Sequence, residues 1–565
     1  MSKKRKKTLK KVTQAIFLTL AILALIWIPQ TVFGSERIRT HISLLGFSLS
    51  VDSLERYAEE GVIDKELQPY TNSLDKKALA QLRQILQKRI YIDNWSLYRL
   101  TRSPIGEEIL KALGEIVTTQ PNGNNGFYAV RGALVTAASK RKKDSFTLLD
   151  AIRQFPTKEI WINTNKLKQL KNDLTSLIEY REATIAAIVK ATESETTGVD
   201  KTKANLSQLP DIRQFGSLKI LQQTITIPSR RHNSPLNFKS SKQFQANLYI
   251  PLEITKPAPI VVISPGFSSE PMAFDYLGKH LATNGIAVAI PEHVGSGKNN
   301  KTAVLQGRKE LVINPIEFIE RPLDVKYVLD ELELLALSDP FFKKRLNIDE
   351  VGVIGHSLGG YTALALAGAK INNRKLGDRC QNKKIVLNIS LLLQCRASEL
   401  PSLPYQLKDE RIKGVIAVSP ISSTVFGSEG LSKIKVPTMI VAGSKDIVAP
   451  VIQEQIYPFT WLKTSVKYLA LLNPADHFSN SGAVEKSSSE STFVEEIMGQ
   501  SSSSTKDYLK ALSLAFIKAQ ICNELKYLPY LSNAYAKTIF DKKINLNIVQ
   551  NLKLKQLEEN SNYIP

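Results

Sequence analysis

One serine of the chain stands in a setting that could make it a nucleophile. Ser357 lies in the run Gly355-His-Ser357-Leu-Gly359, between the apolar stretch Val351–Ile354 and small and apolar residues at helical spacing. This pattern is typical of a nucleophile elbow, a tight strand-to-helix turn that lifts a serine hydroxyl above the edge of a sheet. Glycine suits the flanking positions because the two backbones pass closely there. We interpret Ser357 as a catalytic nucleophile, with an ordinary glycine-rich turn as the alternative.

His477 is the histidine best placed to activate such a serine. It is one of six histidines, and it lies in a loop directly after Lys467–Leu472, which we predict to be a strand. A serine hydroxyl is a poor nucleophile until a base takes its proton, and an imidazole with a pKa of about 6.5 does so reversibly at neutral pH. We expect His477 to be this base. The competitor, His293, follows the predicted strand Ile286–Ile290 and is expected to line the substrate pocket with Tyr361.

The third member of a triad is a carboxylate that fixes the tautomer of the base. When the nucleophile sits on such an elbow, the acid lies between the serine and the histidine in the chain, at the end of a strand. Asp446 meets this demand because it follows the apolar run Thr438–Val441. Asp476 is adjacent to the histidine and is expected to cap its loop. Asp409 precedes a predicted strand and so lies at the wrong end of the sheet.

The tetrahedral intermediate of acyl transfer needs two backbone N–H donors. Leu358, directly after the nucleophile, supplies one. The second is expected from Phe267, in the loop Ser264-Pro-Gly-Phe267 that follows the predicted strand Ile260–Ile263. A simple Pro-Gly turn is the alternative, but it does not explain why the turn falls at this point of the topology.

The elements that would hold these residues alternate between strand and helix. Such alternation predicts an α/β fold with a mostly parallel sheet covered by helices on both faces. Right-handed crossovers then bring the functional strand ends to one edge. The predicted strands are 220–226, 245–249, 260–263, 286–290, 351–354, 415–418, 438–441 and 467–472, and the predicted helices include 274–284 and 322–337.

The domain organisation follows from changes in this pattern. We predict a helical domain at 36–165 without catalytic residues, a helical linker at 166–215, a catalytic domain at 216–540 and a C-terminal tail at 541–565. Residues 371–412 form an insertion in the catalytic domain. Its apolar run Ile389–Leu393 could cap an acyl pocket or pack against the helical domain.

The first 35 residues predict export. A basic start is followed by the apolar run Val12–Ile28 and by Gly34-Ser35, where a signal peptidase could cut. A cleaved signal is favoured over a retained anchor, and the rest of the chain is expected in the periplasm, the envelope or outside the cell. The net charge of +22 is partly concentrated in this start. It favours contact with anionic membrane surfaces over nucleic acid, since no basic stripe interleaved with aromatics is present.

Three cysteines are consistent with an oxidising compartment. Cys380 and Cys395 lie in the same insertion, where they could form a disulfide or remain two buried thiols. Cys522 is expected to be a small buried apolar group. The sequence has no metal-binding motif such as H-E-x-x-H or C-x-x-C, and the predicted mechanism needs neither a metal nor another cofactor.

The chain resembles α/β-hydrolases, within them the platelet-activating-factor acetylhydrolase and dienelactone-hydrolase-like group. It is most similar to largely cyanobacterial secreted hydrolases with an N-terminal helical domain of unknown function. The resemblance implies an α/β-hydrolase fold, Ser357 as nucleophile, and Phe267 and Leu358 as oxyanion donors. It rests on Ser264-Pro-Gly-Phe, on the runs Leu277–His293 and Gly355–Gly360, on Glu320-Arg-Pro-Leu-Asp324-Val and on Ala475-Asp-His-Phe.

Two departures from the acetylhydrolases are visible. Their acid follows the strand after the elbow, where this chain has Val418-Ser-Pro-Ile421 and no carboxylate. That moves the acid to Asp446, as in dienelactone hydrolases and cutinase-like polyester hydrolases. The Pro265-Gly266 pair also replaces the usual His-Gly. These departures leave acyl-ester hydrolysis as the expected reaction, whereas they weaken the case for phospholipid specificity.

The sequence therefore predicts an exported serine esterase acting on small-molecule or lipid esters through an acyl-enzyme. An acetylhydrolase-like role in lipid breakdown is the narrowest version. The alternatives are a cutinase- or dienelactone-hydrolase-like esterase, and a hydrolase-fold envelope protein that binds partners without catalysis. The sequence makes no prediction of the oligomeric state.

Overall fold

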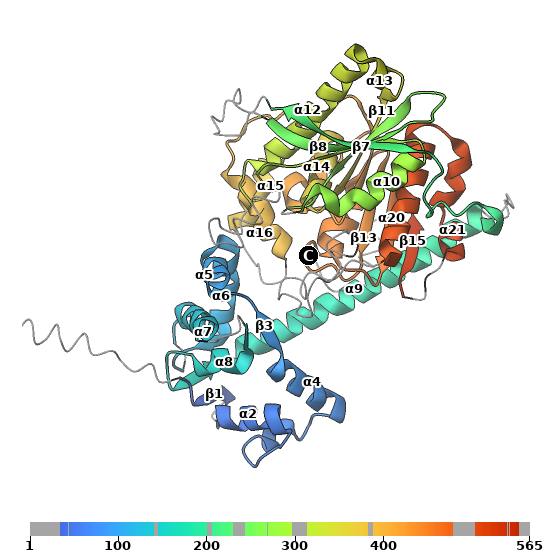
Figure 1. Ribbon diagram of the computed structural model, residues 1–565. Helices are drawn as coiled ribbons and strands as arrows, with labels where there is room; N and C mark the ends of the chain where they lie inside the picture. Colours follow the sequence, from blue (N-terminus) through green and yellow to red (C-terminus); the bar gives the residue numbers. More distant parts are fainter. Residues whose placement is uncertain are drawn as a thin grey trace, which may run out of the picture. The chain divides into compact units, whose positions relative to one another are not determined.

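The computed structural model describes residues 34–552 except 43–44, 122, 141–144, 200–205, 230–242, 268, 296–312, 382–387, 478, 480–502, 540 and 542. Most of the predicted targeting segment, residues 1–33, lies outside the described residues. Within the described part of the chain, no helix is long and apolar enough to span a membrane. The chain divides into two compact units, one of Met1–Ile90 with Leu113–Leu167 and one of Tyr91–Ala112 with Lys168–Pro565 (Figure 1).

The second unit is built around a large sheet. Its strands are β7 (Ile220–Pro228), β8 (Gln243–Pro251), β9 (Ala258–Ser264), β10 (Ala287–Pro291), β11 (Leu346–His356), β12 (Ile412–Val418), β13 (Thr438–Gly443), β14 (Lys467–Asn473) and β15 (Asn545–Val549). Among the described residues their order is β15-β14-β13-β12-β11-β9-β10-β8-β7. The strands from β9 to β14 pair in parallel, and β8 and β15 pair antiparallel with the two borders of this parallel block. The predicted mostly parallel sheet is confirmed.

The strand order reverses beside β9. The chain places β10 on one side of β9 and then β11 on the other. Open α/β sheets bind ligands outside the carboxyl ends of the strands at such a reversal. Ser264 is the last residue of β9 and His356 the last of β11. The two predicted oxyanion-donor segments therefore begin at the reversal point.

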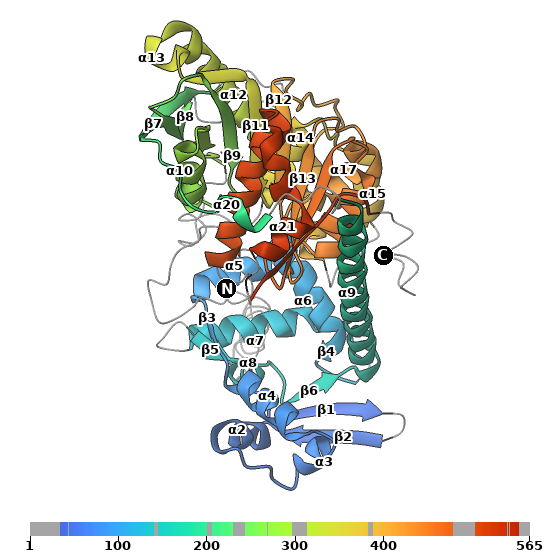
Figure 2. The same ribbon diagram turned by 90° about the vertical axis from the view of Figure 1, so that its right-hand side faces the viewer.

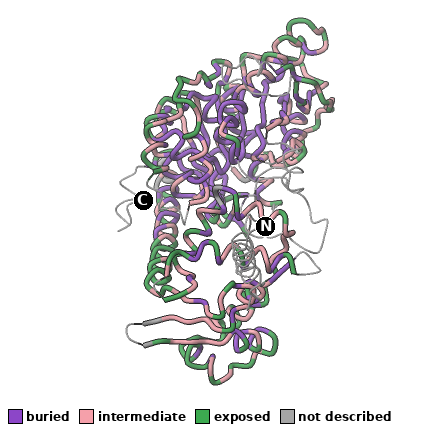
Figure 3. Tube along the Cα trace, turned by 90° about the vertical axis from the view of Figure 1, so that its left-hand side faces the viewer, coloured by how far each residue is buried: buried purple, intermediate pink, exposed green. Residues whose placement is uncertain are grey.

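Helices cover both faces of this sheet, as predicted. Ile260 and Val262 of β9 belong to one hydrophobic core and Val261 and Ile263 to the other, because successive side chains of a strand point to opposite faces. Figure 3 shows buried residues concentrated in this unit. On the first face lie α12 (Glu317–Ser338), α14 (Leu358–Leu366) and α17 (Ser423–Leu431), and on the second α10 (Asp275–Thr283), α20 (Ser503–Phe516) and α21 (Asn533–Thr538). The other helices of this unit include α5 (Asn94–Arg102), α13 (Pro340–Lys343), α15 (Asn373–Gln381), α16 (Ile389–Cys395) and α18 (Tyr457–Trp461).

The segment predicted as a helical linker is a long helix that joins the core. Helix α9 (Thr164–Val199) is continuous (Figure 2). Its Tyr180, Ile185 and Ile188 are buried in the first of the two cores. The linker interpretation was wrong for this half of the helix. Its few buried apolar side chains stand within a largely polar sequence, and the overall polarity hides them.

The C-terminal tail predicted from residue 541 is also corrected. Residues Asn545–Val549 form β15, which pairs antiparallel with β14 from Leu469↔Val549 to Asn473↔Asn545. Leu546, Ile548 and Val549 are buried. A five-residue strand at the end of a polar segment gives too short an alternation to be recognised from sequence.

The first unit is not all-helical, which overturns the prediction for residues 36–165. Residues 45–50 alternate apolar and polar side chains, with Leu45, Phe47 and Leu49 on one side, which is the pattern of a strand. Strands β1 (Arg37–Ile42), β2 (Leu45–Ser50), β4 (Val117–Thr118) and β6 (Glu159–Ile162) form a sheet of order β2-β1-β6-β4, and β3 (Arg89–Tyr91) pairs with β5 (Ser145–Thr147). Helices of this region are α2 (Val51–Glu60), α3 (Gln68–Thr71), α4 (Lys76–Gln87), α6 (Pro104–Ile116), α7 (Phe127–Ser139) and α8 (Leu148–Arg153).

Candidate active site

Ser357 occupies a strained turn between β11 and α14. Its φ is +57° and its ψ is −117°, a combination that L-residues avoid and that occurs where the surrounding structure enforces it. The flanking glycines explain how the turn fits. A Cβ on Gly355 would lie 1.9 Å from the carbonyl oxygen of Gly359, and a Cβ on Gly359 would lie 1.9 Å from the carbonyl oxygen of Ser264. The turn is therefore a nucleophile elbow in its backbone geometry.

His477 lies in hydrogen-bonding distance of both predicted partners. Its Nε2 is 2.9 Å from Oγ of Ser357, and its Nδ1 is 2.8 Å from Oδ2 of Asp446. A carboxylate only accepts, so Nδ1 carries the proton and Nε2 is left to accept from the serine hydroxyl. The histidine side chain is 1% exposed and the aspartate side chain is fully buried. The three side chains form one continuous chain from residues that are far apart in sequence.

Asp446 is held by four donors. Its Oδ1 accepts from the backbone N–H groups of Val448 and Ala449, at 3.0 and 2.8 Å. Its Oδ2 accepts from Nε2 of Gln455, at 3.0 Å, in addition to His477. These bonds fix the carboxylate plane behind the imidazole. Sequence reasoning missed Gln455, because an amide nine residues downstream carries no spacing signal.

His356 supports the backbone of the base. Its Nε2 lies 2.8 Å from the carbonyl oxygen of His477. Burial, together with the neighbouring His477, lowers the pKa of His356 to about 3. The ring is therefore neutral near pH 7, and its Nε2–H donates to that carbonyl. Sequence reasoning treated this position only as the variable residue of the elbow.

The predicted oxyanion donors border the serine. Leu358 is the first residue of α14, and the N–H of a first helical residue has no partner within its own helix. The loop of Phe267 is packed against the elbow, since a Cβ on Gly266 would lie 3.4 Å from Cβ of Ser357. The two predicted donor positions thus belong to segments that adjoin the serine, the start of α14 and the loop after β9.

The two residues predicted to line the substrate pocket, Tyr361 and His293, are both buried and hydrogen-bonded within the protein. Tyr361 is fully buried, its hydroxyl donates to the carbonyl oxygen of Phe318 at 2.7 Å, and its ring stacks on Phe426 with centroids 4.9 Å apart. His293 is buried behind the oxyanion loop and bonds to Ser264. Both are turned inward because their polar atoms find partners within the core.

The competing carboxylates behave as the sequence suggested. Asp476 accepts from the backbone N–H and the hydroxyl of Ser479, at 2.9 and 2.7 Å, and so closes its own loop. Asp409 lies just before β12, at the amino edge of the sheet, and pairs with Arg411 at 2.7 Å. Neither contributes to the cluster around Ser357.

The insertion at 371–412 packs on its own unit. A disulfide joins Cys380 of α15 to Cys395 of α16, with Cα atoms 5.6 Å apart, which resolves the two alternatives for these cysteines. Oε1 of the buried Gln394 accepts from the backbone N–H groups of Thr424 and Val425, at 2.7 and 2.8 Å. Helix α16 is thereby fixed to the first turn of α17. Residues 382–387 of the insertion lie outside the described part.

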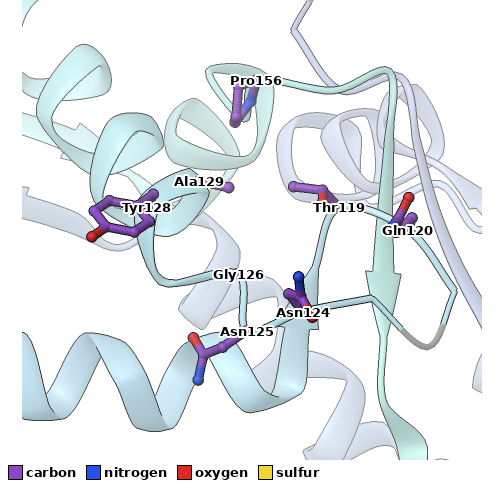
Figure 4. A pocket seen from close by; sticks show the side chains of 8 residues that line it. All are labelled: Thr119, Gln120, Asn124, Asn125, Gly126, Tyr128, Ala129 and Pro156. Carbon is purple, nitrogen blue, oxygen red and sulfur yellow. The ribbon is translucent and has the colours of Figure 1, made fainter.

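The first unit contains a cavity of its own, of about 410 Å³. Figure 4 shows Tyr128 on one side and Thr119 and Gln120 on the other. Its lining combines amide, hydroxyl and aromatic side chains without a histidine or a carboxylate, so it offers no general base. Across the described residues, no group of three or more His, Cys, Asp or Glu is arranged to hold a metal ion.

Comparison with known protein families finds a match to part of the chain. A family model described as alpha/beta hydrolase of unknown function (DUF1400) matches residues 34–163. The match covers most of the first unit and residues 91–112 of the second, and it stops before the sheet that carries Ser357, Asp446 and His477. The curated proteins contain no match to the chain.

Proposed function

We propose that the protein is an α/β-hydrolase, and specifically a serine hydrolase that cleaves carboxylic esters through an acyl-enzyme. The family-model match at residues 34–163 and the mostly parallel sheet support this assignment. The observation that carries the proposal is the unbroken contact from Asp446 through His477 to Ser357, with distances of 2.8 and 2.9 Å. Histidine, serine and carboxylate in this order are the constellation that activates a hydroxyl for acyl transfer. Its place at the reversal of strand order agrees with where such sheets bind ligands.

The proposed reaction proceeds in two steps. Oγ of Ser357 attacks the ester carbonyl carbon while Nε2 of His477 takes the hydroxyl proton, and the carbonyl oxygen becomes an oxyanion. The N–H groups of Leu358 and Phe267 stabilise this oxyanion. His477 then gives its proton to the departing alcohol, leaving Ser357 acylated. Water, deprotonated by His477, attacks the acyl group and releases the acid. Asp446 stabilises the imidazolium in both steps without being protonated.

We propose a substrate class that is broader than that of an acetylhydrolase. The acid lies after β13 rather than after β12, where Ser419 and Pro420 stand instead of a carboxylate. This arrangement favours an acyl or lipid ester of the kind that cutinase-like or dienelactone-hydrolase-like enzymes cleave. Platelet-activating-factor acetylhydrolase activity is the narrower alternative. The basic start of the chain supports contact with an anionic membrane surface.

We further propose that the protein works outside the cytoplasm, in the periplasm, the envelope or the medium. The apolar segment after the basic start is what supports export. The Cys380–Cys395 disulfide agrees with it, because such bonds persist in oxidising compartments and are rare in the cytosol.

A fluorophosphonate probe tests the proposed reaction directly. We expect one adduct, located on Ser357 by peptide mass spectrometry, and none on heat-unfolded protein, because labelling needs the assembled triad. The Ser357→Ala variant should lose the adduct and hydrolyse p-nitrophenyl acetate at least about 1000-fold more slowly. Unchanged hydrolysis by this variant would overturn the proposal in favour of a binding protein. A series of esters from acetyl to long acyl chains then separates acetylhydrolase-like from lipase-like use.

A further inference from the structure

Helix α12 carries a buried charged side chain that ends on the oxyanion loop. Arg321 is 1% exposed. Its Nη1 lies 2.7 Å from the carbonyl oxygen of Pro265 and its Nη2 lies 3.0 Å from that of Gly266. Its Nε lies 3.3 Å from Oε2 of Glu317, one turn earlier on the same helix. A buried guanidinium is costly unless it is paired and bonded, and here its bonds go to two consecutive carbonyls of the loop that holds Phe267.

The planarity of the peptide bond gives these contacts a direction. The carbonyl of Gly266 and the N–H of Phe267 belong to the same peptide group, which is trans, so the two point in opposite directions. Fixing the carbonyl toward Arg321 therefore fixes the direction of the N–H, which points the opposite way within the same peptide plane. A Cβ on Gly266 would meet both Ser357 and His356, which shows how close this peptide lies to the nucleophile.

A second set of buried groups anchors the start of the same loop. Oγ of Ser264, the last residue of β9, lies 2.9 Å from Nε2 of His293, and Nδ1 of His293 lies 2.8 Å from Oδ2 of Asp324. These three hydrogen-bonded residues have the composition of a catalytic triad, and we call them the anchoring chain. However, Ser264 is 0% exposed, so no substrate reaches its hydroxyl. Asp324 stands three residues after Arg321, on the same face of α12.

We propose that Arg321 is a positioning residue of the oxyanion hole, which it orients by binding the carbonyls of Pro265 and Gly266. The anchoring chain, Ser264–His293–Asp324, holds the end of β9 in register. The proposal rests on the proposed function, because it concerns the donor Phe267 of that same site. Arginine suits the task and lysine does not, since only the planar guanidinium fork reaches two neighbouring carbonyls with separate N–H groups.

The distinguishing readout is stabilisation of the tetrahedral oxyanion. Arg321→Lys keeps the buried charge beside Glu317 but loses the fork. Removal of one oxyanion donor typically lowers kcat about 100- to 1000-fold, and a misaligned donor should lower it by roughly 10- to 100-fold. KM should stay unchanged, and the Ki of a trifluoromethyl ketone, which forms the same oxyanion, should rise in parallel with the fall in kcat. The pH dependence of kcat/KM should not move, because the triad is intact.

Arg411→Lys is the matched control. Arg411 also bonds to α12, through Asp330 and Glu333, but at the opposite edge of the sheet. It should lower Tm without changing kcat or the Ki of the ketone. If Arg321→Lys lowers Tm alone, with kcat and Ki within threefold of the parent, Arg321 is only structural and the proposal fails.

A milder variant covers the case in which Arg321→Lys does not fold. Ser264→Ala removes one hydroxyl from the anchoring chain and should lower kcat about fivefold to tenfold, with the ketone Ki rising equally and KM unchanged. No change in kcat or Ki would also overturn the proposal.

Fluorophosphonate labelling of Ser357 in the parent separates the test of the proposed function from the test of the role of Arg321. Absence of the adduct refutes the proposed function, whereas an adduct together with unaffected variants refutes only the role of Arg321 and its anchoring chain.

Discussion

Nε2 of His356 donates a hydrogen bond to the carbonyl oxygen of His477 over 2.8 Å. The residue beside the proposed nucleophile thus holds the backbone of the proposed base. The two rings are also in contact, with centroids 5.0 Å apart. Because the elbow and the base loop come from different parts of the chain, this bond keeps the distance between Ser357 and His477 constant.

Loss of that bond should weaken catalysis without removing any triad member. His356→Leu leaves the His477 carbonyl without this donor, which should cost about 1–2 kcal/mol of folding stability. Because the base loop is then less firmly held, kcat/KM should also fall, by roughly tenfold if misalignment of His477 raises the barrier by about 1.4 kcal/mol. Ester hydrolysis measured at pH 8 checks this. His280→Leu is the control, because His280 is equally buried but belongs to the core on α10. Equal activity of both variants and the parent would contradict the supporting role.

Replacement of the proposed acid should be far more severe. In Asp446→Asn the new amide can donate to Nδ1 and so favours the wrong imidazole tautomer, which lowers kcat by about 10⁴ in comparable triads. Asp476→Asn is the matched control, because Asp476 is adjacent to His477 but bonds to Ser479. Its kcat should stay within a few-fold of the parent. The reverse order of effects would show that the acid has been misassigned.

Stability should fall in mild acid because of buried neutral histidines. Burial, and next the nearby Lys510, lower the pKa of His280 to about 4. A base whose folded pKa lies below its unfolded value of about 6.5 stabilises the fold above that pH and loses this contribution as the pH falls toward the folded pKa. For His280 the loss is about 2 kcal/mol between pH 7 and pH 5. We expect a lower urea midpoint at pH 5, and a smaller shift in His280→Leu. An identical shift in the variant would exclude this histidine as a cause.

Reduction of the disulfide should loosen the insertion. The Cys380–Cys395 bond closes a loop with a sequence separation of 15, for which the chain-entropy estimate is about 3 kcal/mol. The variant with both cysteines replaced by serine should have a lower Tm, and dithiothreitol should lower the Tm of the parent but not of this variant. The Cys522→Ser variant controls for the remaining thiol. Burial raises the pKa of the Cys522 thiol to about 12, so Cys522 of the parent should resist alkylation in the folded protein. A parent insensitive to reductant would contradict the stabilising role.

The cluster around Ser357 could be found from sequence because each member follows an apolar run. In a parallel sheet the carboxyl ends of all strands meet at one edge, so the positions after β11, β13 and β14 had to converge. The elbow added a local signal, since its glycines are required by backbone contact. The structure brings Ser357, Asp446 and His477 to hydrogen-bonding distance. It does not bring Tyr361 or His293 to the surface, because burial of a polar side chain depends on partners that sequence spacing does not reveal.

Arg321 lies in a run that carries the family resemblance, but its helical spacing also holds a signal of its own role. Glu317, Arg321 and Asp324 recur at i, i+4 and i+7, which places three charged residues on one face of a helix whose apolar residues predict burial. A charged stripe facing a core indicates a buried polar network. The hydrogen-bond partners of Arg321 could not be predicted, because two of them are backbone carbonyls, which any residue has.

The strands of the first unit were missed for a different reason. They are short, and the stronger helical patterns around them dominated the interpretation.

Strand β15 has a consequence for any shortened form of the protein. It covers the outer border of β14, whose residues from Leu469 to Asn473 would otherwise present unpaired N–H and C=O groups. An open, apolar border of this kind is a template for pairing with another chain. A chain ending near residue 541 would retain every residue proposed for catalysis and yet be prone to self-association. The last strand therefore protects the solubility of the protein rather than its chemistry.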